Sequence, residues 1–161
     1  MKKLFFSFCF LILIAPVLNA GGFGASGAFF INQNFIDDEL CGVLIDYAAD
    51  TIPFIFTGDV TFDNGGVKGA LAGIGFCAGN INLYKALNFF YTPELCAGYD
   101  FLEDKVILEN AFYVGLNFFA MSKLQMFIQC GWAPQVFFAT DDVDFKLVNF
   151  PVRAGVRFWS K

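Results

Sequence analysis

Five ionisable residues of this sequence lie where strand alternation would turn them away from an apolar face. They are three carboxylates and two arginines: Asp46, Asp59, Glu94, Arg153 and Arg157. Charged groups in an apolar interior are costly unless they are paired and hydrogen-bonded. We therefore expect an interior ionic network that fixes the strand register. Four polar residues on the same predicted faces should join it: Asn88, Asn117, Gln125 and Gln129.

Catalysis is not expected, because the chain contains no histidine, the usual general base and the commonest transition-metal ligand. The three serines beyond the N-terminal segment, Ser26, Ser122 and Ser160, have no evident base beside them. The inward carboxylates are better explained as partners of the two arginines. We predict no catalytic, cofactor-binding or metal-binding residues.

Four cysteines follow the N-terminal segment, at spacings that do not suggest a zinc site. Alternation places Cys41 and Cys130 on apolar faces, and it turns Cys77 and Cys96 inward. No disulfide is predicted between the inward pair, because a hairpin centred near residues 82 and 83 brings Cys77 opposite Asn88. We expect small apolar packing roles, and the sequence leaves the oxidation state open.

The elements that position these residues are strands, since the apolar signal has a period of two. The clearest segment, 149–158, alternates Phe150, Val152 and Val156 with Arg153 and Arg157. Eight segments alternate in this way, near the ten residues that a tilted membrane-spanning strand requires. They are 23–31, 41–47, 52–62, 67–78, 87–97, 112–118, 124–133 and 150–158.

The connections between the eight segments alternate between acidic and nearly uncharged. In an antiparallel sheet, alternate connections lie at the same end. The acidic end should therefore present solvated surface loops, which lack the spacing of a calcium loop. Their acidic residues are Asp37, Asp38, Glu39, Glu103, Asp104, Asp141, Asp142 and Asp144. Asp63, Asp100 and Glu109 are expected at the same end.

The N-terminal twenty residues are typical of a secretory signal peptide. Lys2 and Lys3 precede the apolar run 4–14, and a small residue, Ala20, precedes the expected cut. That run is too short to span a bilayer as a helix. Residues 1–20 are therefore predicted to be removed, and 21–161 to form one domain. The formal charge of −5 argues against nucleic acid as a partner.

Together these features resemble the small eight-stranded outer-membrane barrels of the OmpA, OmpX and opacity-protein type. The resemblance covers 21–161 as architecture, an all-β, antiparallel, up-and-down transmembrane barrel. It implies a monomer in the outer membrane of a diderm bacterium, in contact with lipid and lipopolysaccharide. In that superfamily, assembly machinery reads an aromatic residue of the last strand, and Phe158 and Trp159 are both candidates here.

An eight-stranded barrel has an interior just wide enough to be filled by side chains. We therefore expect a plugged barrel with a structural or surface-interaction role and no catalysis. Two alternatives stay open: a soluble periplasmic, lipocalin-like binding barrel and a narrow channel for small solutes or protons. The sequence does not specify any extracellular ligand of the loops.

Overall fold

The computed structural model describes residues 21–32, 35–50, 52–140 and 142–160, and side chains from residues 32 and 35–39 are left out of the description. The expected signal peptide, residues 1–20, lies outside the described residues. No helix in the described part of the chain is long and apolar enough to cross a membrane.

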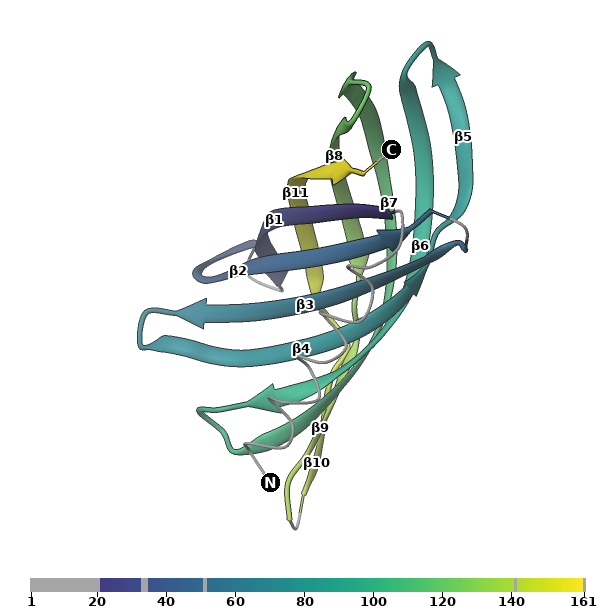
Figure 1. The fold of residues 1–161 in the computed structure, drawn as a ribbon. Coiled ribbons are helices and arrows are strands. Elements are labelled where there is room, and N and C mark those ends of the chain that lie inside the picture. Colours follow the sequence, from purple (N-terminus) through teal and green to yellow (C-terminus); the bar gives the residue numbers. More distant parts are fainter. Residues whose placement is uncertain (1–20, 33–34, 51, 141, 161) are drawn as a thin grey trace.

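Eight antiparallel strands close into a barrel. Each pairs with the next along the chain, and the last pairs with the first, so the sheet closes on itself. The strands are β1 (Gly21–Asn32), β2 (Phe35–Ala49), β3 (Phe54–Asp63), β4 (Gly66–Phe76), β6 (Leu87–Asp100), β7 (Lys105–Met121), β8 (Leu124–Trp132) and β11 (Phe150–Trp159). In Figure 1, β1 to β4 run across the view while β7, β8 and β11 run up it. The predicted eight-stranded architecture is confirmed.

Three short strands extend the barrel wall. They are β5 (Ala78–Tyr84), β9 (Gln135–Phe138) and β10 (Val143–Lys146). β5 continues β4 along β6, and β9 continues β8 along β7. β10 pairs with β9 as a hairpin.

The break between β4 and β5 has a local cause on the neighbouring strand. β4 pairs with β6 as far as Glu94, and β5 resumes the pairing at Tyr91. Pro93 lies inside this gap. Proline has no backbone N–H to donate, and because β6 pairs with neither β4 nor β5 at this position, no ladder hydrogen bond is lost. Cys77, at the break, donates its N–H to the Pro53 carbonyl at 2.7 Å. The proline is therefore accommodated within β6 by interrupting its partner strand.

The side chains follow an inside-out pattern, with apolar groups on the outer surface and charged groups within. On β11, Phe158 is 59 % exposed on the outside, whereas Arg153 is 3 % exposed. Apolar side chains also fill part of the interior, in small clusters such as Leu71, Cys96 and Ile107. The outer face carries large exposed residues on every barrel strand, among them Val43, Ile74, Leu95, Leu116 and Ile128.

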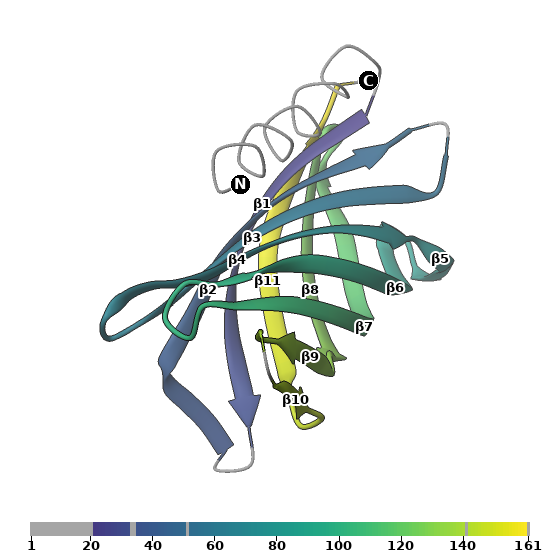
Figure 2. The same cartoon turned by 90° about the horizontal axis from the view of Figure 1, so that it is seen from below.

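The two ends of the barrel differ in their connections. The β3–β4 and β6–β7 turns, the end of β1, the start of β2 and the β9–β10 pair lie at one end, to the left and bottom of Figure 2, and the C-terminus lies at the other. The first group holds the acidic turns, and we call this side the acidic end. The opposite side, where Gly22 pairs with Trp159, is the terminal end.

Strands reach further toward the acidic end than the sequence suggested, and this corrects three expectations. Asp37, Asp38 and Glu39 lie within β2 and not in a loop, because β1 and β2 stay paired up to Asn32 and Phe35. Glu109 lies inside β7 and is buried. Asp100 ends β6 and is also buried, because its carboxylate accepts hydrogen bonds from the N–H groups of Leu102 and Glu103. A four-residue turn, 101–104, therefore replaces the expected long loop.

Candidate functional site

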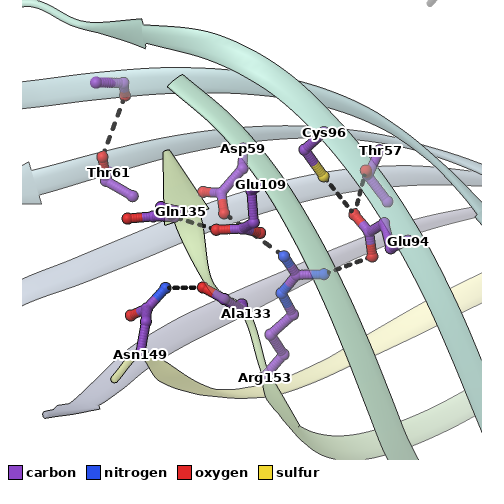
Figure 3. A network of polar contacts seen from close by, with 11 residues as sticks. Thr57, Asp59, Thr61, Glu94, Cys96, Glu109, Ala133, Gln135, Asn149 and Arg153 are labelled. Carbon is purple, nitrogen blue, oxygen red and sulfur yellow. Dashed lines mark hydrogen bonds and ion pairs between the residues drawn. The ribbon is translucent and has the colours of Figure 1, made fainter. Parts of the chain in front are cut away.

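Arg153 of β11 lies at the centre of one interior group of charges, which we call the Arg153 group (Figure 3). Its Nη1 lies 3.0 Å from Glu94 Oε2, and its Nη2 lies 3.8 Å from Asp59 Oδ2. All three residues are buried, at 3 %, 4 % and 6 % exposure. The guanidinium also lies over the Tyr113 ring, 4.1 Å from its centroid. One cation from β11 thus bridges carboxylates from β3 and β6.

Glu94 is hydrogen-bonded on both oxygens. Thr57 Oγ1 donates to Glu94 Oε1 at 2.6 Å, and the Cys96 thiol donates to the same oxygen at 3.3 Å. Gly73 of β4 makes room for this cluster, since a Cβ there would lie 2.7 Å from Thr57 Oγ1. Glu94 is therefore the most fully satisfied carboxylate of the Arg153 group.

Arg157 forms a second group nearer the terminal end, which we call the Arg157 group. Its Nε donates to Asp46 Oδ1 at 2.7 Å, and its Nη1 donates to Gln125 Oε1 at 3.1 Å. The Trp159 indole N–H donates to the same Gln125 oxygen at 3.2 Å. The five ionisable residues singled out in the sequence all point into the barrel, but they form two groups instead of one network.

The other predicted polar residues are placed less centrally. Asn88 donates to Asn117 Oδ1 at 3.3 Å and accepts from Asn82 at 3.1 Å, so the three amides form a ladder across β5, β6 and β7. Gln129 is half-buried beside Arg153, its register partner across β8 and β11. Among the described residues, no hydrogen bond links this ladder to either arginine group.

A third interior pair was not expected from the sequence. Glu109 of β7 accepts a hydrogen bond from Gln135 Nε2 of β9 at 2.6 Å, and both side chains are buried. Alternation along β7 was the available signal, since Glu109 shares parity with the inward-facing Ala111 and Tyr113. Its nearness to Glu103 and Asp104 in sequence made a surface loop the simpler interpretation.

Spaces inside the barrel differ greatly in size along its length. A cavity of about 300 Å³ opens at the acidic end, and one of about 310 Å³ lies at the terminal end. Between them is a space of about 20 Å³, lined by residues of both arginine groups. A site needs roughly 10–15 Å³ to hold one water. This space can hold water but is much smaller than either end cavity.

Several buried polar atoms have no hydrogen-bond partner among the described residues. Three are donors or hydroxyl groups: Arg153 Nε, Thr92 Oγ1 and Tyr113 Oη. Two are pure acceptors, Asp59 Oδ1 and Asn149 Oδ1. Native interiors rarely leave such atoms unpaired, so each needs an explanation.

The acidic end carries surface ion pairs. Lys105 Nζ lies 2.5 Å from Asp144 and 3.0 Å from Glu103, which ties the β6–β7 turn to β10. Asp104 accepts a hydrogen bond from the Tyr99 hydroxyl, and Asp142 is exposed. Asp141 lies outside the described residues. Lys105 thus partly neutralises the acidic surface.

The two candidate aromatic residues of β11 face opposite ways. Phe158 is exposed on the outer surface, whereas the Trp159 indole reaches inward to Gln125. The four described cysteines are free thiols, Cys41 and Cys130 outside and Cys96 buried within, with Cys77 half-buried at the strand break. In the described part of the chain, no three cysteine or acidic side chains converge as a metal site would require.

Comparison with known proteins adds evidence on the fold. No family model matches the sequence, and no curated protein matches it. Among solved structures, a de novo designed transmembrane β-barrel is similar, with a TM-score of 0.51 and 11 % identity over 86 % of this chain and 95 % of that one. The crystal structure of Neisserial surface protein A is also similar, with a TM-score of 0.39 and 13 % identity over 86 % of this chain and 95 % of that one. The similarity to the designed barrel shows that the chain has the fold of a small transmembrane β-barrel.

Proposed function

We propose that the chain is an outer-membrane barrel with a closed lumen and a structural or surface-interaction role, without catalysis. The observation that carries this proposal is the middle of the lumen, where the Arg153 and Arg157 groups leave about 20 Å³. This space is small beside the two end cavities, and we infer that it blocks the passage of solutes and hydrated ions between them.

The distribution of apolar and charged side chains supports a membrane setting. A soluble, lipocalin-like barrel would hold its apolar stripe inside and leave Arg153, Arg157 and Glu94 in water. Here Arg153 and Glu94 are buried, and large apolar side chains cover the outside. Lipid offers no partner for an open strand edge, so closure of the sheet also suits a bilayer.

Placement in the outer membrane of a diderm bacterium rests on the sequence features that resemble exported barrels. The outward position of Phe158 suits recognition by the barrel-assembly machinery better than the inward Trp159 does. Outer-membrane lipid and lipopolysaccharide would then be the partners of the outer face. We further propose a monomer, with the acidic end outside the cell and no nucleic-acid partner.

Fractionation tests the membrane assignment. The full chain should be recovered in the sarkosyl-insoluble envelope, and its electrophoretic mobility should change on boiling. Both results follow if a closed barrel resists detergent until heated. Recovery in the soluble periplasmic fraction, with the same mobility before and after boiling, would contradict the proposal.

Planar-bilayer recording tests the closed lumen against the narrow-channel alternative. Purified wild-type barrel should carry no steady current. The double variant Arg153→Ala/Glu94→Ala removes the two bulkiest members of the Arg153 group as a neutral pair, and it should open a measurable conductance. A conducting wild type would refute the closed lumen. Lys123→Met, at the exposed β7–β8 turn, controls for effects of purifying and reconstituting a variant.

A further inference from the structure

The cavity at the acidic end has the size and lining of a ligand site. Its volume of about 300 Å³ lies at the lower end of small-molecule pockets. One part of its wall is apolar and consists of Phe30, Leu40, Leu71, Ile107 and Phe137. The other part includes Asp59, Glu109 and Asn149. A lining of this kind suits a compact molecule with an apolar body and one polar head.

The charge of the lining decides the sign of that head. Five carboxylates line the cavity, against two lysines and Arg153. At the rim, Lys105 pairs with Glu103 and Asp144. Arg153 is shared between Glu94, at 3.0 Å, and Asp59, at 3.8 Å. The lining as a whole therefore carries more negative than positive charge, and its carboxylates Asp59 and Glu109 are buried.

Hydrogen bonding points the same way. Asp59 Oδ1 and Asn149 Oδ1 are buried acceptors without a donor in the described residues, and both side chains line this cavity. Asn149 is 1 % exposed and donates its own Nδ2 to the Ala133 carbonyl at 3.0 Å, so its oxygen is the atom left unpaired. Figure 3 shows Asp59 and Glu109 with their carboxylates next to each other. An ammonium group offers three donors and no acceptor.

We propose that this cavity binds a small primary ammonium compound with a short apolar body. The ammonium group would lie at Asp59 and Glu109 and donate to the unpaired Asp59 Oδ1, and the apolar body would lie against Leu71, Ile107 and Phe137. A bare metal ion fits less well, because no three cysteine or acidic side chains converge among the described residues. The acidic rim would raise the local concentration of cations at the entrance.

The test uses n-butylammonium as probe and the full chain folded in detergent micelles, labelled with nitrogen-15. The side-chain amide resonances of Gln135 and Asn149 report on the acidic-end cavity, and those of Gln125 and Asn88 report on the far end. We expect saturable shifts at Gln135 and Asn149 and none at Gln125 and Asn88. Uncharged 1-butanol, of similar shape, should not reproduce these shifts.

Two conservative variants remove one charge each from the site. Glu109→Gln and Asp59→Asn should each weaken binding by about tenfold to a hundredfold, the range for loss of one charge-assisted hydrogen bond. The matched control is Asp63→Asn, which removes a carboxylate from the β3–β4 turn at the same end but outside the cavity lining. Its affinity should stay within about twofold of wild type, because exposed charges interact weakly through water.

Three results would overturn the proposal. They are the absence of saturable shifts at Gln135 with millimolar probe, equal binding of 1-butanol, and equal weakening by Asp63→Asn and Glu109→Gln. The comparison of the two probes needs only wild-type protein, so it decides even if a variant does not fold. Failure here would leave the closed lumen intact, since that proposal is measured as current and not as binding.

Discussion

Replacing Arg153 by methionine should destabilise the barrel strongly, because the change leaves two carboxylates without a cation. Glu94 would keep its bonds from Thr57 and Cys96, whereas Asp59 would lose its ion-pair partner. Breaking a buried ion pair by removing one partner costs about 3–5 kcal/mol. Loss of the contact with the Tyr113 ring adds about 0.5–2 kcal/mol. We expect a loss near the upper part of the first range.

The structure also predicts how the loss depends on Glu94. Glu94→Gln keeps an oxygen to accept from Thr57, and Arg153 keeps Asp59, so the single change should cost about 1.5–3 kcal/mol. In the double variant Arg153→Met/Glu94→Gln, only Asp59 stays charged. Its cost should fall below the sum of the two single costs by about 1–3 kcal/mol, the range of coupling between residues in contact.

The assay is equilibrium unfolding in urea of the full chain in phospholipid vesicles. Tryptophan fluorescence follows the transition, and the heat-dependent gel shift confirms the folded fraction. Lys123→Met is the matched control, since it also replaces a cation by methionine but at an exposed turn. Its free energy of unfolding should change by less than about 0.5 kcal/mol.

Two results would refute this reasoning. A cost below about 1 kcal/mol for Arg153→Met would mean that water reaches Glu94 and Asp59 and screens their charges, as it does for exposed pairs. Additive costs in the double variant would mean that Arg153 and Glu94 do not interact energetically, despite their 3.0 Å contact.

Three further predictions follow from the same structure. Arg157→Met should cost about 1–3 kcal/mol in the urea assay, less than Arg153→Met, because Arg157 lines the terminal-end cavity and its side chain is more exposed than that of Arg153. Ile128 faces outward at the level of the Arg153 group, and Ile128→Lys should lower the free energy of unfolding by about 2–4 kcal/mol. Phe145→Lys, at the acidic end, should lower it by only about 0–1 kcal/mol. Phe158→Ala should lower the amount of heat-modifiable barrel in the outer membrane, whereas Phe150→Ala, on the same face of β11, should not; equal yields would exclude Phe158 as the assembly signal.

The strands and their faces could be predicted because the period of two continues through each segment. In β11, one parity carries Phe150 and Phe158 and the other carries Arg153 and Arg157, so a single assignment orients every side chain. The pairing of the inward charges could be predicted as well, because a buried arginine is tolerated only when it is paired with a carboxylate.

Strand ends and the partition of charges could not be predicted in the same way. Glu109 shares its parity with Ala111, yet the extension of β7 past Glu109 depends on long-range pairing with β6 on one side and β9 on the other. Likewise, which carboxylate each arginine contacts depends on barrel register: Asp46 and Asp59 lie on neighbouring strands and contact different arginines. Such long-range pairing is set by closure of the sheet and leaves no local pattern in the sequence.

The two proposals constrain each other through Arg153. The same guanidinium lines both the space in the middle of the lumen and the acidic-end cavity, so a cation bound at Asp59 and Glu109 would meet its positive charge on moving further inward. Repulsion by Arg153, together with the narrow space behind it, would hold such a ligand at the acidic end. A barrel built in this way would bind a cation on its outer side without transporting it. Opening the Arg153 group in the bilayer experiment should therefore produce a current that n-butylammonium reduces when added from the acidic side.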